Sequence, residues 1–249
     1  MRQQTLRFGE SWARIAPWRG GGGAAHLVVG PDAGVSSSVV LSCVERARAS
    51  GYQSVLTSAV SPAESDAFVA AGFSVQERLH LLAVDLEAEP PLPKKTLERA
   101  TRRDRTGVLE LDAASFDAFW QLGPVGLRDA LSATPTSRFR VGHQVLTHTP
   151  ADEAGVPRGN ERDKRVAAYG ITGLAGSHGY LQRVAVHPDA RRDGWGRTLV
   201  SDALGWLWRN GAHRAYVNTQ LENHRALALY ESFGFAILPA GLCVLGRQL

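Results

Sequence analysis

The chain of 249 residues has few cysteines and lacks long apolar runs. Its two cysteines, Cys43 and Cys243, lie far apart, so we expect no disulfide framework, and a reducing cytoplasm fits best. No apolar run approaches the length of a membrane span, and the N-terminal segment lacks the continuous apolar stretch of a secretory signal. Histidines and cysteines are scattered, without the spacing of a metal site. These absences predict a cytoplasmic protein with no membrane span and no bound metal.

Lysine is also rare, occurring only as Lys94, Lys95 and Lys164. Arginine supplies nearly all of the positive charge, and the formal net charge is only +4 although the sequence pI is about 9.4. The densest basic stretch runs from Lys94 to Arg105. Such a run is compatible with nucleic-acid binding, but Glu98 and Asp104 interrupt it and no aromatic residue is interleaved. We interpret the stretch as a solvated linker and expect no nucleic-acid partner.

A cluster of prolines marks the clearest boundary in the chain. Pro90, Pro91 and Pro93 precede the basic stretch, and such composition is typical of a connection between domains. The sequence therefore predicts an N-terminal domain over residues 1–92, a basic linker over 93–105 and a C-terminal domain over 106–249. A second polar segment, Thr149–Lys164, is rich in Pro and Gly and is predicted to be a flexible hairpin connection.

Hydrophobic periodicity predicts alternating helices and strands in the C-terminal domain. The predicted strands are Val108–Leu111, Arg138–Thr147, Arg165–Thr172, Tyr180–Val186, Ala215–Thr219, Phe235–Leu238 and Leu242–Gly246. The predicted helices are Ala113–Leu122, Val125–Ala133, Trp195–Asn210 and a helix from the cap Asn223 to about Ser232. Gly211 and Gly234 are expected to end the last two helices. This succession predicts an α+β fold with a mixed sheet.

The N-terminal part contains a faint echo of this order. Its predicted elements are a helix over Val39–Ala49, a strand over Ser54–Ala59, a helix over Pro62–Ala71 and a strand over Val75–Leu86. Gly51 and the pair Gly72–Phe73 stand where Gly211 and the pair Gly234–Phe235 stand in the C-terminal part. The match concerns the pattern and includes little residue identity. It suggests an internal duplication.

A glycine-rich turn, Arg191–Thr198 (RRDGWGRT), lies between a predicted strand and a predicted helix. Glycine lets a ligand approach the backbone closely, and the first turn of a helix favours an anion. Arg191, Arg192 and Arg197 add positive charge there. A turn that binds nothing is the structural alternative. The pattern differs from NTPase and dinucleotide phosphate loops, so some other diphosphate is the predicted ligand.

A second motif follows one strand later. On a helix, Asn223, Ala226 and Tyr230 share one face, and the small Ala226 leaves room for a ligand between the two polar side chains. Each residue also has a purely structural interpretation: Asn223 as a cap, Tyr230 as a core ring and Gly234 as a helix stop. Their joint spacing, after the glycine-rich turn, favours a ligand site.

With these two motifs the sequence resembles the GCN5-related N-acetyltransferase (GNAT) superfamily. The family's cofactor motif, Q/R-x-x-G-x-G/A, matches Arg191, Gly194 and Gly196, and its motif N-x-x-A-x-x-x-Y, followed by G-F, matches the helix from Asn223. The strand LQRVAV is similar to the family's fourth strand, and the resemblance covers roughly Arg105–Leu249. It implies a mixed, mostly antiparallel, twisted sheet, splayed at the CoA site and with helices on both faces. The N-terminal half is then a degenerate partial repeat.

The resemblance implies an acetyl-CoA-dependent N-acetyltransferase, with the following site. The pantetheine arm is expected along Val184, Ala185 and Val186 and beside Asn223 and Ala226. The pyrophosphate is expected at Arg191, Arg192, Asp193, Gly194, Trp195, Gly196, Arg197 and Thr198. Tyr230 is expected to protonate the leaving thiolate, and the N–H of Val184 to stabilise the oxyanion.

The general base and the acceptor stay open. Positions where relatives carry acidic residues hold Tyr180 and Asn218. The remaining candidates for the base are Glu222, Asp189, His187, His178 and a water chain. A site without a carboxylate base suits an α-amine better than a lysine, whose deprotonation costs about 3.4 kcal/mol more. We expect a primary amine, either a protein N-terminus or a small molecule. The segments LQRVAVHP and ALALYESFGF also resemble ribosomal-protein N-terminal acetyltransferases.

The alternative function is a CoA-binding or protein-interaction module with little catalysis. Aligning Gly72–Phe73 with Gly234–Phe235 puts Ser61 opposite Asn223, Glu64 opposite Ala226 and Phe68 opposite Tyr230. The counterpart of the glycine-rich turn, near Gly30–Ser36, lacks the motif. We therefore expect the N-terminal half to have lost cofactor chemistry and to shape the substrate cleft or an interface. The protein is expected to be a monomer or a homodimer.

Overall fold

The computed structural model describes the chain except for residues 1–2, 9–10, 21–22, 31–35 and 146–163. It forms two compact units. Unit 1 comprises Met1–Ala83, Gly123–Gly126 and Val217–Leu249, and unit 2 comprises Val84–Leu122 and Leu127–Tyr216. The predicted domain boundaries stay a prediction, because a compact unit of contacts need not coincide with a domain of the sequence. Most of the polar segment Thr149–Lys164 and of the segment Gly30–Ser36 lies outside the described residues.

Unit 1 is built on a mixed sheet with the strand order β1-β2-β3-β4-β11-β5. These strands are β1 (Gln4–Phe8), β2 (Ser11–Pro17), β3 (Ala24–Val29), β4 (Ser54–Thr57), β5 (Ser74–Asp85) and β11 (Ala236–Gln248). Only the β3–β4 pair is parallel among the pairs described for this unit. The helices α1 (Ser37–Ala49), α2 (Pro62–Ala70) and α6 (His224–Glu231) complete the unit, with η1 (Trp18–Gly20) after β2. Its core includes Leu27, Val40, Val44, Phe68 and Leu245, all at most 2% exposed.

The helix ends of unit 1 follow the local sequence. Ser36 caps α1, with its Oγ accepting from the N–H of Val39 at 3.3 Å. Gly72 follows the end of α2 and Gly234 the end of α6, and both glycines have φ of 82°. This left-handed conformation suits glycine because it lacks a Cβ. After each glycine, a phenylalanine N–H donates back to the helix at 3.0–3.2 Å.

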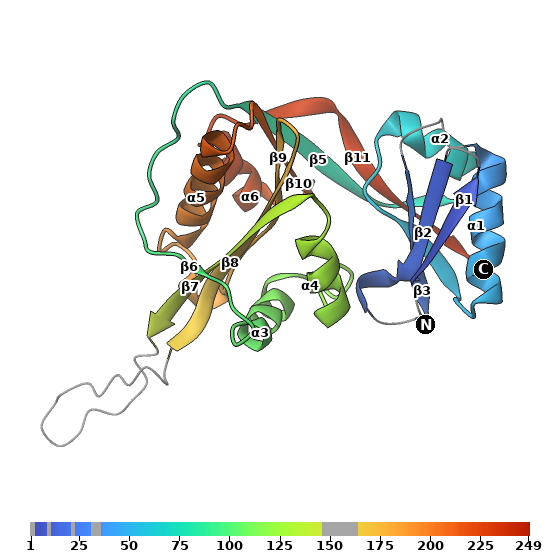
Figure 1. Cartoon of the computed structure of the whole chain (residues 1–249), viewed down its shortest axis with the longest axis horizontal. Helices are drawn as coiled ribbons and strands as arrows, with labels where there is room; N and C mark the ends of the chain where they lie inside the picture. The colour runs from blue at the N-terminus through green and yellow to red at the C-terminus, as the bar shows by residue number, and fades with distance from the viewer. Residues whose placement is uncertain (1–2, 9–10, 21–22, 31–35, 146–163) are drawn as a thin grey trace, which may run out of the picture. The chain divides into compact units, whose positions relative to one another are not determined.

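Unit 2 is built on a mixed sheet with the order β10-β9-β8-β7-β6. The strands are β6 (Glu98–Arg99), β7 (Thr136–Val145), β8 (Lys164–Ala175), β9 (His178–Val186) and the first three residues of β10 (Arg214–Gln220). β6 to β9 pair antiparallel, and β9 pairs parallel with β10. The helices α3 (Arg105–Ser115) and α4 (Pro124–Leu131) lie on one face and α5 (Trp195–Arg209) on the other (Figure 1). The predicted fold class is confirmed.

Alternation along the strands of unit 2 explains why both faces are covered. Tyr169 and Ile171 of β8 pack in a cluster with Val108 and Leu111 of α3. Ala168, the residue before Tyr169 in the strand, packs instead in a cluster with residues of α5. Because successive side chains of a strand point to opposite faces, the apolar run of β8 fills two cores at once.

Four predicted elements are wrong in type or extent. The predicted strand Val108–Leu111 lies inside helix α3. This helix ends at Ser115, so only the beginning of the helix predicted at Ala113–Leu122 is helical. The two strands predicted at Phe235–Leu238 and Leu242–Gly246 form one strand, β11. The residues between Leu238 and Leu242 interrupt its register with β5 without ending the strand. The other predicted helices and strands are present, with ends that differ by a few residues.

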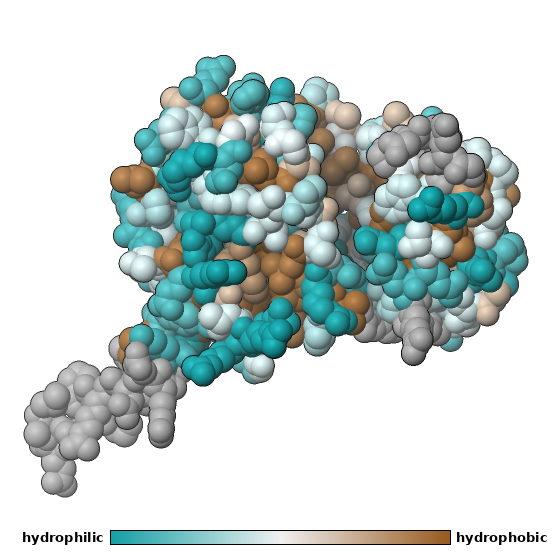
Figure 2. All heavy atoms as spheres, viewed as in Figure 1, coloured by the Kyte–Doolittle hydropathy of each residue, from teal (hydrophilic) through white to brown (hydrophobic). Residues whose placement is uncertain are grey.

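The surface mixes polar and apolar side chains on the face shown in Figure 2. Exposed large apolar side chains include Leu92, which directly precedes the segment predicted as linker. Among the helices that the structure describes, none is long and apolar enough to cross a membrane. Both cysteines are buried and free.

Candidate functional site

β9 carries a bulge just before the residues expected to bind the pantetheine arm. Ile171 of β8 pairs with Arg183 of β9. The next residue of β8, Thr172, pairs with Leu181, so Gln182 is an extra residue in β9. Upstream of the bulge, β9 also pairs with β10, over the first three residues of each strand. Downstream of the bulge, the ladder partners of β9 among the described residues of unit 2 all belong to β8. A bulge bends its strand and increases the twist.

The backbone N–H and C=O groups of Val184 and Val186 point away from β8. Val186 faces Ala168 in the ladder, and the N–H of the next residue, His187, donates to the C=O of Ala167 at 2.8 Å. Because bonded and non-bonded pairs alternate along an antiparallel ladder, Val184 and Val186 belong to non-bonded pairs. Their main-chain groups are directed to the side of β9 where an extended ligand adds as a further strand.

The turn between β9 and α5 contains two residues in the left-handed conformation. After η3 (Pro188–Ala190), Arg192 has φ of 66° and Gly194 has φ of 80°. A positive φ is uncommon for a residue with a side chain. Gly194 is the N-cap of α5 and has no capping side chain. The N–H of Thr198 donates to Gly194 at 3.0 Å, so earlier N–H groups of the first turn point out of the helix end.

Two polar atoms at this helix end are buried without a hydrogen-bond partner among the described residues. They are Oγ1 of Thr198 and Nε1 of Trp195, in side chains only 1% and 6% exposed. A buried polar atom without a partner costs about 1–3 kcal/mol. The side chains of Arg191, Arg192 and Arg197 are exposed around the same turn. Positive charge and an uncapped helix N-terminus together favour an anion.

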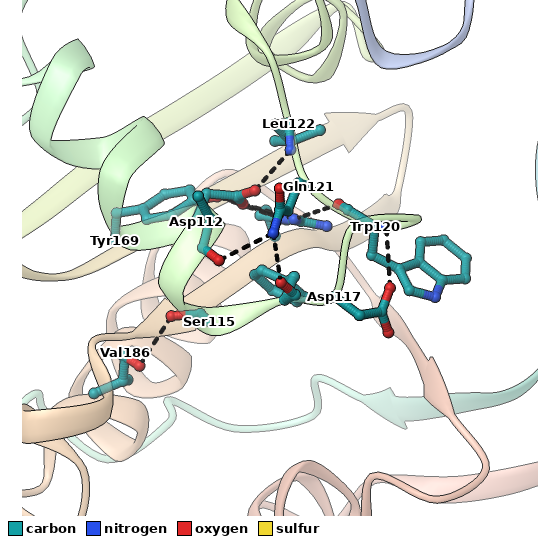
Figure 3. Close-up of polar contacts among 11 residues, drawn as sticks. Asp112, Ser115, Asp117, Trp120, Gln121, Leu122, Tyr169 and Val186 are labelled. Carbon is teal, nitrogen blue, oxygen red and sulfur yellow. Dashed lines mark hydrogen bonds and ion pairs between the residues drawn. The ribbon is translucent and has the colours of Figure 1, made fainter. Parts of the chain in front are cut away.

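A buried polar network joins α3 to β8 and β9 (Figure 3). The carboxylate of Asp112, fully buried, accepts from Nε and Nη2 of Arg183 at 2.8 and 2.6 Å and from the hydroxyl of Tyr169. Burial raises the pKa of Tyr169, and the negative charge of Asp112 adds to that shift. Arg183 directly precedes Val184. The network therefore fixes β9 between its bulge and the outward-pointing amides.

The same network holds the loop between α3 and α4. Arg183 also donates to the C=O of Trp120 at 2.7 Å, and its guanidinium lies 3.5 Å from the ring centre of Phe116. The N–H of Leu122 donates to Asp112 at 2.7 Å. At the end of α3, the hydroxyl of Ser115 donates to the C=O of Val186 at 3.2 Å (Figure 3). The α3–α4 loop is thus tied to the downstream half of β9.

Helix α6 carries the second predicted motif and belongs to unit 1. Oδ1 of Asn223 accepts from the N–H of Ala226 at 3.2 Å, so Asn223 caps the helix. Tyr230 is 6% exposed, and its ring lies 5.7 Å from that of Phe235. Burial raises the pKa of Tyr230, and a phenol carries its proton at neutral pH even without such a shift. The side chain can therefore act as a proton donor.

The candidate bases differ in their partners. Arg165 donates to the carboxylate of Asp189 at 3.0 Å and lowers the pKa of that carboxyl. His187 lies 3.6 Å from the same carboxylate. Tyr180 stacks on Tyr216 with ring centres 5.7 Å apart, and burial raises its pKa. These three residues belong to unit 2.

His178 lies on the same strand as Tyr180, with its ring 5.8 Å from that of Tyr216. The side chain of Glu222 is 94% exposed and belongs to unit 1. Within the described residues, no group of three or more acidic, His or Cys side chains is arranged to hold a metal ion.

Unit 2 brings together the predicted residues of β9 and of the glycine-rich turn, which are consecutive along the chain. Ala185 differs from its neighbours, because it belongs to a bonded pair with Tyr169 and directs its main-chain groups toward β8. Asn223, Ala226 and Tyr230 lie together on α6 of unit 1.

Sequence reasoning missed Asp112 and Arg183. Each is a charged residue within an otherwise largely apolar stretch, LELDAA and LQRVAV. That position is the signal that could have identified them, since a buried charge needs a partner.

Comparison with known proteins finds a family model that matches part of this chain. Residues 126–235 match the model of the acetyltransferase (GNAT) family. The ribosomal-protein bS18 alanine N-acetyltransferase of Salmonella typhimurium is 37% identical over 73 residues, which are 29% of this chain and 49% of that protein. The enzyme of the same name from Escherichia coli is 35% identical over 71 residues, or 28% of this chain and 48% of that protein. The chain thus spans about half the length of these curated relatives.

Solved structures share the fold across nearly the whole chain. A tandem GNAT protein from the clavulanic acid biosynthesis pathway has a TM-score of 0.63 at 16% identity, covering 98% of this chain and 81% of that one. A GCN5-related N-acetyltransferase from Sphaerobacter thermophilus has a TM-score of 0.60 at 14% identity, covering 96% and 76%. At such identities the likeness concerns the fold alone.

Proposed function

We propose, from the match of residues 126–235 to the model of the acetyltransferase (GNAT) family, that the protein is an acetyl-CoA-dependent N-acetyltransferase. Its acceptor is a primary amine. The observation that carries the proposal is the continuity of two features in unit 2. The outward-pointing amides of Val184 and Val186 are followed directly by an uncapped helix N-terminus with arginines around it.

The chemistry of acetyl-CoA fits these features one by one. Its pantetheine arm contains amide groups, which match the outward-pointing main-chain groups of Val184 and the N–H of Val186. Its diphosphate is an anion, which the N-terminus of α5 and the side chains of Arg191 and Arg192 attract. The buried hydroxyl of Thr198 has no protein partner within the described residues and is available as a donor. Acetyl is the acyl group that the family name implies.

In the proposed reaction the amine nitrogen attacks the thioester carbonyl, forming the C–N bond and breaking the C–S bond. The N–H of Val184 stabilises the oxyanion that develops on the carbonyl oxygen. Tyr230, whose phenol is protonated at neutral pH, donates its proton to the leaving thiolate. The proton of the amine passes to a base that stays open, with His187, His178, Glu222, Asp189 or water as candidates.

We further propose an α-amine as the acceptor, in a protein N-terminus or a small molecule. By the family resemblance, Tyr180 and Asn218 stand where relatives carry acidic residues. The hydrogen bond from Arg165 lowers the pKa of Asp189, which makes this carboxylate a weaker base. Without a strong base, the acceptor with the lower pKa is favoured, by about 3.4 kcal/mol for an α-amine over a lysine. The curated relatives, whose names specify an alanine of a ribosomal protein, support the same class of acceptor.

The decisive assay measures thiol release from acetyl-CoA with a panel of amines. The panel contains a peptide with a free N-terminus, the same peptide N-blocked but with a free lysine, and a small primary amine. We expect turnover to be fastest with a free α-amine. Thiol release that is equal with and without any amine would support the alternative, a CoA-binding or protein-interaction module with little catalysis.

For the N-terminal half, we propose a degenerate copy of the acetyltransferase fold. The segment β3-α1-β4-α2-β5 repeats the order of β9-α5-β10-α6-β11, including a parallel first pair. Phe68 and Phe73 form an edge-on ring pair at 5.5 Å, as Tyr230 and Phe235 pair at 5.7 Å. In place of a ligand site, the carboxylate of Glu64 bonds to the N–H of Ser61 at the start of α2. This negative charge disfavours an anionic ligand there.

A further inference from the structure

We propose that Lys95, in the basic segment before α3, is a further phosphate-binding residue of the acetyl-CoA site. This role rests on the proposed function. Nζ of Lys95 lies 2.6 Å from Oδ2 of Asp193 and 4.7 Å from the ring centre of Trp195. These two residues flank Gly194, the N-cap of α5. Lys95 therefore places a positive charge on the glycine-rich turn, from a segment about 100 residues away in sequence.

The position of Lys95 is fixed by contacts on both sides of it. Before it, the C=O of Pro91 accepts from the hydroxyl of Ser201 on α5. After it, Leu97 packs in the cluster that contains Trp195, and β6 pairs with the edge of β7. The segment is thus anchored to unit 2 at three points around Lys95, which lowers the entropic cost of using its side chain in binding.

The ion pair with Asp193 leaves Lys95 capacity for a ligand. The two side chains are 30% and 53% exposed, and exposed pairs of this kind contribute little to stability. An ammonium group has three N–H donors, of which the carboxylate of Asp193 uses one. A Cβ atom placed on Gly194 would lie 3.9 Å from Cε of Lys95, so the Lys95 side chain lies against the turn itself.

Charge also explains why this turn needs a lysine. Asp193 places a carboxylate within the segment that would hold the diphosphate, and like charges in contact oppose binding. Lys95 neutralises that carboxylate and adds hydrogen-bond donors for phosphate oxygens. Lys94, its neighbour, is exposed, and no ion pair is described for it. Lys94 is therefore a matched control for Lys95, because the side chain of Lys95 lies against the turn and that of Lys94 lies in solvent.

The test compares Lys95→Met with Lys94→Met in the full chain. Methionine keeps an apolar stem of similar length on the Trp195 ring and removes the charge, so the segment keeps its packing. Calorimetry measures the Kd of each variant for acetyl-CoA and for S-acetyl-pantetheine, which has no phosphate. We expect Lys95→Met to weaken acetyl-CoA binding by about tenfold, the scale of one charge-assisted hydrogen bond. Binding of S-acetyl-pantetheine should stay within twofold, roughly the scatter of surface substitutions.

Lys95→Arg should restore most of the affinity, because it restores the charge. Equal affinity of Lys95→Met and Lys94→Met for acetyl-CoA would overturn the role of Lys95 while leaving the proposed function standing. An equal loss of affinity for both ligands would also overturn it, by showing that Lys95 only supports the fold of the turn. A wild-type protein that binds neither ligand would overturn the proposed function, and this inference with it.

3′-Dephospho-acetyl-CoA identifies the phosphate that Lys95 contacts. If the wild-type protein and Lys95→Met differ as much with this ligand as with acetyl-CoA, the contact is to the diphosphate. If the difference disappears, the contact is to the 3′-phosphate. Both results support a phosphate contact, and they distinguish the two groups.

Discussion

Replacing Asp112 by asparagine should destabilise unit 2 strongly, although the change alters few atoms. The carboxylate of Asp112 is fully buried and holds Arg183, whose side chain is only 10% exposed. Asparagine keeps the shape but removes the negative charge. The other described partners of the Arg183 guanidinium are the C=O of Trp120, the hydroxyl of Tyr169 and the ring of Phe116, and none of them carries a full charge.

The size of the effect follows from what remains buried. Breaking a buried ion pair by removing one partner typically costs about 3–5 kcal/mol, because the other charge stays desolvated. Hydrogen bonds from the hydroxyl of Tyr169 and the N–H of Leu122 to the carboxylate are weakened as well. We therefore expect Asp112→Asn to lower the free energy of unfolding by about 3–5 kcal/mol.

The assay is urea unfolding followed by tryptophan fluorescence, with Glu89→Gln as the control. Glu89 pairs with Arg209 at 3.8 Å, also in unit 2, with side chains 55% and 48% exposed. An exposed pair of this kind should contribute under about 1 kcal/mol. If Asp112→Asn costs no more than the control, the carboxylate does not hold a buried charge, and the account of β9 positioning is wrong.

Three other predictions concern the site and the pH response. Tyr230→Phe should lower kcat at least about tenfold, as expected for loss of a general acid, with the Kd for acetyl-CoA within about twofold; an unchanged kcat would make Tyr230 a packing residue. Gly196→Val should abolish acetyl-CoA binding in a folded protein, by placing a side chain in the phosphate space, whereas Gly205→Ala in the same helix should bind normally in calorimetry. Burial, with the positive charges of two nearby arginines, lowers the pKa of His26 from 6.5 to about 4. Between pH 6.5 and pH 4 the unfolded chain then binds more protons than the folded chain. The contribution of neutral His26 to the free energy of unfolding should therefore be complete above pH 6.5 and decrease toward pH 4. In urea unfolding, His26→Gln should make this pH dependence weaker.

The sequence predicted those elements whose ends and faces are locally encoded. α6 begins at Asn223 and ends before Gly234 because a side-chain cap and a left-handed glycine act within a few residues. α5 was likewise predicted from its apolar stripe, and Gly194 from its place at the helix start. Local chemistry also sufficed for the glycine-rich turn, where the motif and the backbone conformation coincide.

Helix α3 was missed because a charge sits on its buried face. Val108, Leu111 and Asp112 are its buried residues, at helical spacing, but Asp112 interrupts the apolar stripe that reveals a helix. The short segment Val-Leu-Glu-Leu, taken alone, then predicts a β-strand. Only the partner, Arg183, which is 71 residues away, makes Asp112 an acceptable core residue, and such pairing is not readable along the chain.

The other misses have the same origin in distant contacts. Leu238 and Leu242 both pair with β5, so the Pro-Ala-Gly segment between them is an irregularity and not a turn. Lys95 belongs to a stretch that composition marks as a solvated linker, yet its side chain packs on Trp195. Composition gives the average environment of a segment and cannot identify the single residue with a fixed partner.

The two halves of β9, before and after the bulge at Gln182, have different strand neighbours. Before the bulge, β9 is an interior strand with a neighbour on each side, and after it the main-chain groups of Val184 and Val186 face away from β8. Exposed strand edges invite pairing with other chains, and proteins normally protect them with charges, prolines or covering segments. Here the protecting partner would be the substrate itself. The protein should therefore be most prone to self-association when its acetyl donor is scarce, and the donor should act as a solubilising ligand as well as a reactant.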